Sequence, residues 1–335
     1  MNIFRTIKGK NAWVFSGLII LTLFSIVMSI TFGPATITSL DIFQCVVNEC
    51  ASPMHDMVIW QIRIPRVLVG LVAGMGLACA GAILQNVTRN PLADPYLFGI
   101  ISGAGLGATI ATLVLNEEQM LALPLAAFLG ALFSVIIVFG IATLLRNMNH
   151  LLLTGVAVSF MLGSISHFIL YLGDPFATNR VIFWLMGSLT RVEMFHFYLI
   201  SIMVLLTLIT IFAFHRQIDA LLLGDESAAS LGVNVDKLRI ILLALCAAVT
   251  ATIVAYCGGI GFVGLIIPHI VRQLVGVTTM PLIVGSALVG GCFLVWVDVL
   301  ARSALSTVEI PIGIITSAIG SIFFLAIMYR TRKTG

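Results

Sequence analysis

Side chains that could take part in chemistry are scarce in this sequence, and the largest group of them forms a short polar segment at residues 224–232. Asp225 and Glu226 come first in this segment, and Gly232 ends it. Acidic residues in a first turn and a glycine at the end are typical of a short helix. An amphipathic helix in a loop can fit a groove on another protein. The segment therefore predicts a docking site for a partner.

Titratable residues within the apolar stretches are few. His167, Asp298 and Glu309 lie in or beside such stretches, where ionisable groups usually mark ion-coupled transport or catalysis. They form no ladder of acids, and the sequence has neither a His-Glu-x-x-His zinc pair nor a Gly-x-Ser-x-Gly motif. We therefore interpret His167 and His269 as packed histidines and expect no catalytic residue, metal or cofactor in this chain. A nucleotide-binding P-loop is also missing, so any ATP and Mg²⁺ must be held by a partner.

The elements that position these residues are predicted to be membrane helices. Of the 335 residues, 60% are hydrophobic and 9% are charged, whereas a soluble domain carries about 25% charged residues. A helix needs roughly 20 largely apolar residues to cross a bilayer. We expect an all-α polytopic membrane protein, with residues 1–335 in one transmembrane domain and the polar segment in a loop at about 215–238. The expected spans are 12–32, 58–83, 92–115, 120–144, 151–172, 192–214, 238–257, 260–275, 281–299 and 311–329.

The distribution of basic residues predicts the orientation. Ten spans put both termini on one side, and that side then receives twelve of the 17 Lys and Arg residues. Cytoplasmic loops carry the excess of Lys and Arg, so we expect both termini in the cytoplasm. The net charge of +3 follows from this orientation and gives no reason to expect a nucleic-acid partner.

Small residues and cysteines leave alternatives open. Gly99, Gly103 and Gly107 recur every four residues, a spacing that favours close helix packing. The glycines of residues 258–264, with Pro268, predict a broken span, which is tolerated only inside protein or beside a water-filled cavity. Packing and a place on a transport pathway both remain possible for that span. Four cysteines lie in apolar spans, where Cys usually behaves as a small hydrophobe, whereas Cys45 and Cys50 share an outer loop and could form a disulfide.

Longer motifs resemble the FecCD/BtuC permease family of ABC importers, in order and over nearly the whole chain. Residues 226–232 are similar to the family's Glu-Ala-Ala-x-x-x-Gly coupling loop, with the alanines displaced by one position. The other similar segments are 63–66, 81–85, 89–95, 151–157, 183–188, 259–269 and 309–313.

The resemblance implies a ten-helix subunit with two inverted halves in the bacterial inner (plasma) membrane. It also implies a second permease subunit, in a homodimer or a close heterodimer, with the homodimer favoured. Two ABC ATPase subunits that hold ATP and Mg²⁺ and a soluble substrate-binding protein outside are implied as well. The implied ATPase-coupling residues are Asp225, Glu226, Ala228, Ala229 and Gly232. The implied docking residues, whose exposed charges would meet acids of the binding protein, are Arg63, Arg66 and Arg302. The implied residues of the cytoplasmic gate are Asn90, Met148 and Asn149.

The resemblance further implies the import of a metal chelate. Iron–siderophore complexes are the commonest cargo of the family, and haem, vitamin B12 and molybdate or tungstate are others. A secondary transporter that works without ATP and a membrane-embedded enzyme are the rival interpretations. Both would need more ionisable or catalytic groups at membrane depth than the sequence offers.

Overall fold

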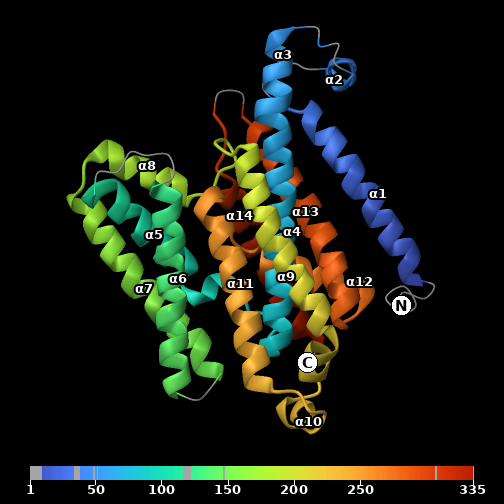
Figure 1. Cartoon of the computed structure of the whole chain (residues 1–335), viewed down its shortest axis with the longest axis vertical. Coiled ribbons are helices and arrows are strands. Elements are labelled where there is room, and N and C mark those ends of the chain that lie inside the picture. The colour runs from blue at the N-terminus through green and yellow to red at the C-terminus, as the bar shows by residue number, and fades with distance from the viewer. Residues whose placement is uncertain are drawn as a thin grey trace.

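The computed structural model describes residues 10–33, 38–47, 50, 52–115, 122–145, 148–305 and 308–334, and every regular element among them is a helix (Figure 1). The prediction of an all-α fold is therefore confirmed. The α-helices are α1 (Lys10–Thr31), α2 (Ser39–Val46), α3 (Pro53–Met57), α4 (Ile64–Thr88), α5 (Ile100–Thr109), α6 (Ala122–Leu145), α7 (Met148–Leu172), α8 (Pro175–Leu185), α9 (Met194–Leu221), α10 (Asp225–Ser230), α11 (Val235–Cys257), α12 (Val263–Val275), α13 (Thr279–Ser303) and α14 (Ile312–Thr334).

Within the described residues, eight helices are long and apolar enough to cross a bilayer. One of them is continuous from Pro53 to Thr88, because the π-helical turn η1 (Val58–Arg63) joins α3 to α4. The two remaining predicted spans contain shorter apolar helices, Ile100–Val114 and Val263–Val275. The pattern of ten apolar elements is thus present, but two of them are only partly helical.

Both short helices follow a stretch of irregular backbone. Arg89, at the end of α4, has a φ of 50°, and the 3-10 turn η2 (Pro95–Phe98) precedes α5. The expected span 92–115 therefore becomes helical throughout only from residue 100, because Pro95 and the left-handed Gly99 interrupt it. The span at 260–275 is broken as predicted, with φ values of 71° at Gly258 and 67° at Phe262.

Helix α4 occupies the centre of the bundle, where α9, α11, α12 and α13 surround it (Figure 1). Small residues allow these close approaches. A Cβ atom added at Gly74 of α4 would collide with the backbone of Gly290 in α13. In the same way, Gly103 and Gly107 of α5 lie against the backbone of α6, so the packing interpretation of this glycine row is confirmed.

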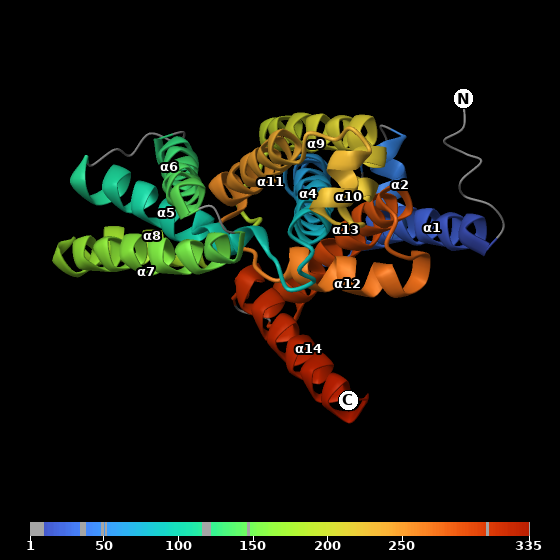
Figure 2. The same ribbon diagram turned by 90° about the horizontal axis from the view of Figure 1, so that it is seen from below.

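Helices α5 to α8 form a group beside this bundle, and α14 extends away from both, as Figure 2 shows. The beginning of α1, the end of α14 and the short helix α10 lie toward the same end of the molecule, and α2 and α3 lie at the other end (Figure 1). We call these the α10 end and the α2 end.

The α2 end is tied together locally. Thr38 caps α2 through a capping box with Asp41, and the hydrogen bonds from Thr38 hold the pKa of the Asp41 carboxyl below its usual value. Cys45 and Cys50 form a disulfide. The four free cysteines are buried, as expected for small apolar side chains.

Candidate functional site

The polar segment forms α10, which begins after Gly224 at a φ of 108° that favours glycine. Asp225, in the first turn of α10, accepts hydrogen bonds at its Oδ1 from Arg89 Nη2 at 2.8 Å and from Arg239 Nη2 at 3.0 Å. Arg89 caps the end of α4, and Arg239 lies near the start of α11. Asp225 therefore attaches α10 to both helices.

The five residues expected in the coupling loop fall into two groups. Asp225 binds arginines of the chain itself, and Ala228 is completely buried. Glu226, Ala229 and Gly232 are exposed. The first group is placed to hold α10 in position, and the second is placed to contact a partner. The coupling role of all five remains a prediction.

Two apolar side chains beside α10 escaped the sequence analysis. Leu223 is 68% exposed and Leu231 is 66% exposed. They flank a helix whose other exposed side chains are small or charged, so this surface combines apolar and acidic contacts. A signal was present in the sequence, since Leu223 borders the polar segment and Leu231 lies within it.

The arginines expected to be exposed at the α2 end are buried instead. Arg63, Arg66 and Arg302 are only 3%, 5% and 4% exposed. Arg66 Nε binds Asp298 Oδ1 at 2.8 Å, and Arg66 Nη2 binds Glu309 Oε2 at 2.8 Å.

The other two arginines contact the chain as well. Arg302 Nε lies 3.4 Å from Asp298 Oδ2, and Arg302 Nη2 donates to the Ser29 carbonyl at 2.8 Å. Arg63 Nη1 donates to the Ile30 carbonyl at 2.6 Å. The expectation of an exposed arginine triplet is therefore wrong, because carboxylates and carbonyls of the chain itself lie within reach. A docking role for these arginines remains a prediction.

The exposed arginines nearby are Arg180 and Arg191. Together with Arg66 and Glu309 they line a recess of about 350 Å³. Sequence motifs gave no signal for these two residues, which lie between the expected spans 151–172 and 192–214.

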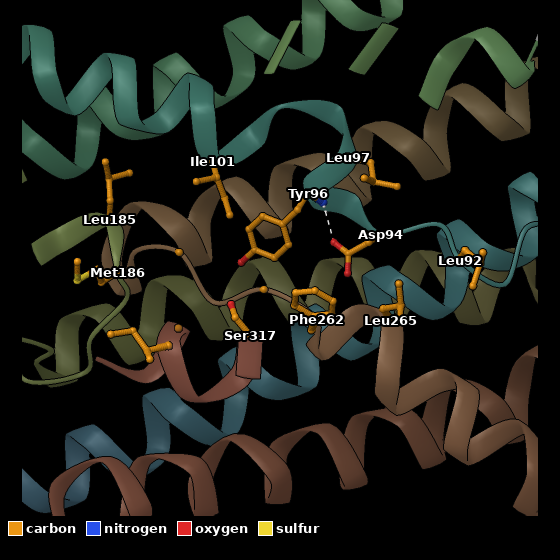
Figure 3. Close-up of a pocket in the computed structure, with 14 residues that line it drawn as sticks. Leu92, Asp94, Tyr96, Leu97, Ile101, Leu185, Met186, Phe262, Leu265 and Ser317 are labelled. Atoms are coloured by element: carbon orange, nitrogen blue, oxygen red, sulfur yellow. Dashed lines mark hydrogen bonds between the residues drawn. The ribbon is translucent and has the colours of Figure 1, made fainter. Parts of the chain in front are cut away.

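A cavity lies where the two broken spans meet. Its volume is about 580 Å³, and its walls come from the irregular stretches before α5 and α12, the end of α8 and the start of α14 (Figure 3). Most of the lining side chains are apolar, among them Leu97, Ile101 and Phe262. The broken span at 258–268 therefore borders a cavity, which is one of the two settings in which irregular backbone at membrane depth is tolerated.

Asp94 and Tyr96 supply polar groups to this cavity. Asp94 Oδ1 accepts a hydrogen bond from the Tyr96 backbone N–H at 2.8 Å, which caps the turn η2. The Tyr96 hydroxyl accepts a hydrogen bond from the Ile260 backbone N–H at 3.3 Å. One tyrosine thus connects the two irregular stretches across the cavity.

A family model described as the FecCD transport family matches residues 21–330. The chain belongs to the FecCD transport family. The expectation of a transport subunit rather than an enzyme is confirmed by this membership.

The FecCD chain is similar to curated permeases with different named cargoes. It is 40% identical over 277 residues to the cobalamin import system permease protein BtuC of Halobacterium salinarum, covering 82% of this chain and 73% of that protein. It is 39% identical to the hemin transport system permease protein HmuU of Yersinia pestis, with coverages of 82% and 84%. It is 37% identical to the Fe(3+) dicitrate transport system permease protein FecD of Escherichia coli, with coverages of 83% and 87%.

A solved structure described as an inward-facing conformation of a metal-chelate type ABC transporter has the same fold. It superposes with a TM-score of 0.85 at 30% identity, and the alignment covers 95% of the FecCD chain and 99% of that chain. The expected permease fold is therefore confirmed.

The expected gate residues of the FecCD chain are only partly described. Asn90 follows α4, and its Oδ1 accepts a hydrogen bond from the Leu92 backbone N–H at 2.9 Å. Met148 and Asn149 begin α7, but their side chains lie outside the described part of the chain. Their role at a gate remains a prediction.

The two histidines in the expected spans differ in how far they are buried. His269 is half-buried and meets Phe323 edge-on, with 5.8 Å between ring centroids. His167 is exposed and, with Tyr171, lines a hollow of about 460 Å³ beside α8, so the expectation that it is packed is wrong. Within the described residues, no group of three His, Cys, Asp or Glu side chains could hold a metal ion.

Proposed function

We propose that this FecCD chain is the permease subunit of an ABC importer that moves a metal chelate, specifically an iron–siderophore complex, into the cytoplasm. The cavity between the two broken spans carries this proposal. Its volume of about 580 Å³ suits a small-molecule ligand, and its walls are mainly apolar. Haem, vitamin B12 and molybdate or tungstate are the alternative cargoes, and the names of the cobalamin and hemin relatives support the first two.

The partners proposed for this chain act at opposite ends. Two ABC ATPase subunits, which hold ATP and Mg²⁺, would bind at the α10 end through Glu226, Leu223 and Leu231, whose exposure supports this placement. A substrate-binding protein would dock at the α2 end, where Arg180 and Arg191 are exposed. A second copy of the permease completes the importer. Nucleotide-driven closure of the ATPases would move α10, and through Asp225 the ends of α4 and α11.

The proposed setting is the bacterial inner membrane, crossed several times, with both termini in the cytoplasm. The common position of α10 and the two ends of the described chain supports this orientation (Figure 1). Thiol labelling of a cysteine introduced at Ser227, in cells with an intact membrane, tests it. Membrane-permeant reagents should label this cysteine and impermeant ones should not.

The decisive experiment is uptake into proteoliposomes that contain the permease, its genetically linked ATPase and its binding protein. The ligand that co-purifies with the binding protein is identified first and then supplied as cargo. Uptake should require ATP and stop with Glu226→Arg while membrane insertion stays normal. Uptake that persists without the ATPase would instead identify a secondary transporter.

A further inference from the structure

An incompletely bonded carboxylate faces the cavity between the broken spans. Asp94 is 6% exposed, and its Oδ2 has no hydrogen-bond partner among the described residues. Figure 3 shows this oxygen directed toward the space beside Phe262 and Leu265, while Oδ1 accepts a hydrogen bond from the Tyr96 N–H. Burying a polar atom without a partner is unfavourable, and native proteins seldom leave one so. This buried oxygen thus lacks the hydrogen-bond partner that a ligand with an N–H or O–H group could supply.

The local structure uses only one of the two carboxylate oxygens. Asp94 caps η2 through Oδ1, with the Tyr96 N–H as donor. An asparagine caps a helix about as well as an aspartate. Capping therefore accounts for Oδ1 and for neither Oδ2 nor the negative charge.

The charge of Asp94 is not balanced by the other walls of the cavity. Among the described lining residues, none is Lys, Arg, His or Glu, and Asp94 is the one Asp. A site with charge of one sign and apolar walls focuses the field and concentrates counter-ions. Anions are repelled from such a site for the same reason.

We propose that this cavity is a transit site for the cargo and that Asp94 Oδ2 binds a hydrogen-bond donor or a positively charged group of it. This inference rests on the proposed import of a chelate, and it restricts the charge that the chelate can carry. Neutral chelates with N–H or O–H groups and cationic chelates fit the site. Anionic chelates and oxyanions do not.

The first test measures the field in the cavity and needs no cargo. Ser317 of α14 lines the cavity, and the full-length Ser317→Cys variant is labelled in nanodiscs with a cationic and an anionic methanethiosulfonate of similar size. The ratio of the labelling rate with the cationic reagent to that with the anionic reagent should be about tenfold higher at this cysteine than for free cysteine in solution. Asp94→Asn, which keeps the cap, should bring this ratio close to the free value. An unchanged ratio in Asp94→Asn would overturn the inference.

A matched control separates local charge from surface potential. Ser164 is exposed on α7 and does not line this cavity, so Ser164→Cys should show the same ratio with Asp94 or Asn at position 94. The chain without an added cysteine gives the background, which should be low because the four free cysteines are buried.

The second test uses defined chelates as probes. Ferrioxamine B, a cationic trihydroxamate iron(III) chelate, should slow labelling of Ser317→Cys, and ferric dicitrate, an anion, should not. Asp94→Asn should abolish this preference. Protection by the anion, or by neither chelate, would overturn the transit site. Labelling requires neither ATP nor a binding protein. If Ser317→Cys shows the expected preference for the cationic reagent but the protein shows no ATP-driven uptake, only the proposed function is contradicted.

Discussion

Asp298 lies between two buried arginines at the α2 end, and this arrangement shows how single charges are used in the protein. Its carboxylate binds Arg66 at 2.8 Å and Arg302 at 3.4 Å. The sequence could not reveal the partner of Arg66, because Arg66 and Asp298 are 232 positions apart. The spacing of four between Asp298 and Arg302 on α13 did signal that pair, but it was not used. Exposure was therefore inferred from charge alone, and tertiary pairing reversed it.

Removing Arg66 should leave a buried charge only partly compensated. Breaking a buried ion pair from one side costs about 3 kcal/mol or more, so Arg66→Ala should markedly lower the midpoint of unfolding in an SDS titration. The exposed Arg191→Ala should leave that midpoint unchanged and, if the recess docks a binding protein, weaken docking in a salt-dependent way. Equal midpoints for the two variants would contradict the structural role of Arg66.

Asp225 and Glu226 are adjacent acids with different surroundings. Asp225→Ala removes the bonds to Arg89 and Arg239, so α10 should separate more easily from α4 and α11. Hydrogen exchange of residues 224–232 should then be faster, whereas the exposed Glu226→Gln should leave exchange near the wild-type rate. If both variants exchange alike, Asp225 does not anchor the helix.

At the scale of elements, apolar length predicted where helices lie, and local geometry decided where they stop. Every expected span contains a helix, because burying the backbone in a bilayer requires internal hydrogen bonds. The break before α12 was predictable from its glycines. The irregular backbone before α5 was not predicted, although Asp94, Pro95 and Gly99 are residue types that favour turns, because the apolar residues around them suggested a continuous span. The cavity could not be predicted either, since it depends on how the two breaks meet in space.

Helix contacts at glycine give a matched prediction. A methyl group at Gly74 would collide with the Gly290 backbone, whereas one at Gly140 of α6 would meet nothing within 4 Å. Gly74→Ala should destabilise the protein by about 1–3 kcal/mol through overpacking, and Gly140→Ala should be neutral or slightly stabilising because alanine favours helix. Thermal unfolding in detergent measures both. A stable Gly74→Ala variant would contradict the close contact between α4 and α13.

At the scale of the whole molecule, α14 extends away from the bundle (Figure 2), and several of its large apolar side chains are exposed. Its side chains Ile322 and Leu325 are 70% and 66% exposed, and their spacing of three places them on one face. Either lipid or a second copy of the chain must cover this face in a membrane. Because α14 also borders the cavity through Ser317, a second copy packed against α14 would lie beside that cavity.

A bulky substitution distinguishes lipid from protein on this face. Lipid accommodates a tryptophan easily, whereas a packed interface does not. If the permease forms a homodimer with α14 at the interface, Leu325→Trp should lower the dimer fraction measured by native mass spectrometry. Leu23→Trp on the exposed face of α1 should leave that fraction unchanged. Leu23 is a suitable control because it is also exposed, at 60%. A dimer fraction that is unaffected by Leu325→Trp and Ile322→Trp together would place lipid on α14 and require a different subunit interface. The cavity would then open toward the bilayer, and a polar cargo would need another route.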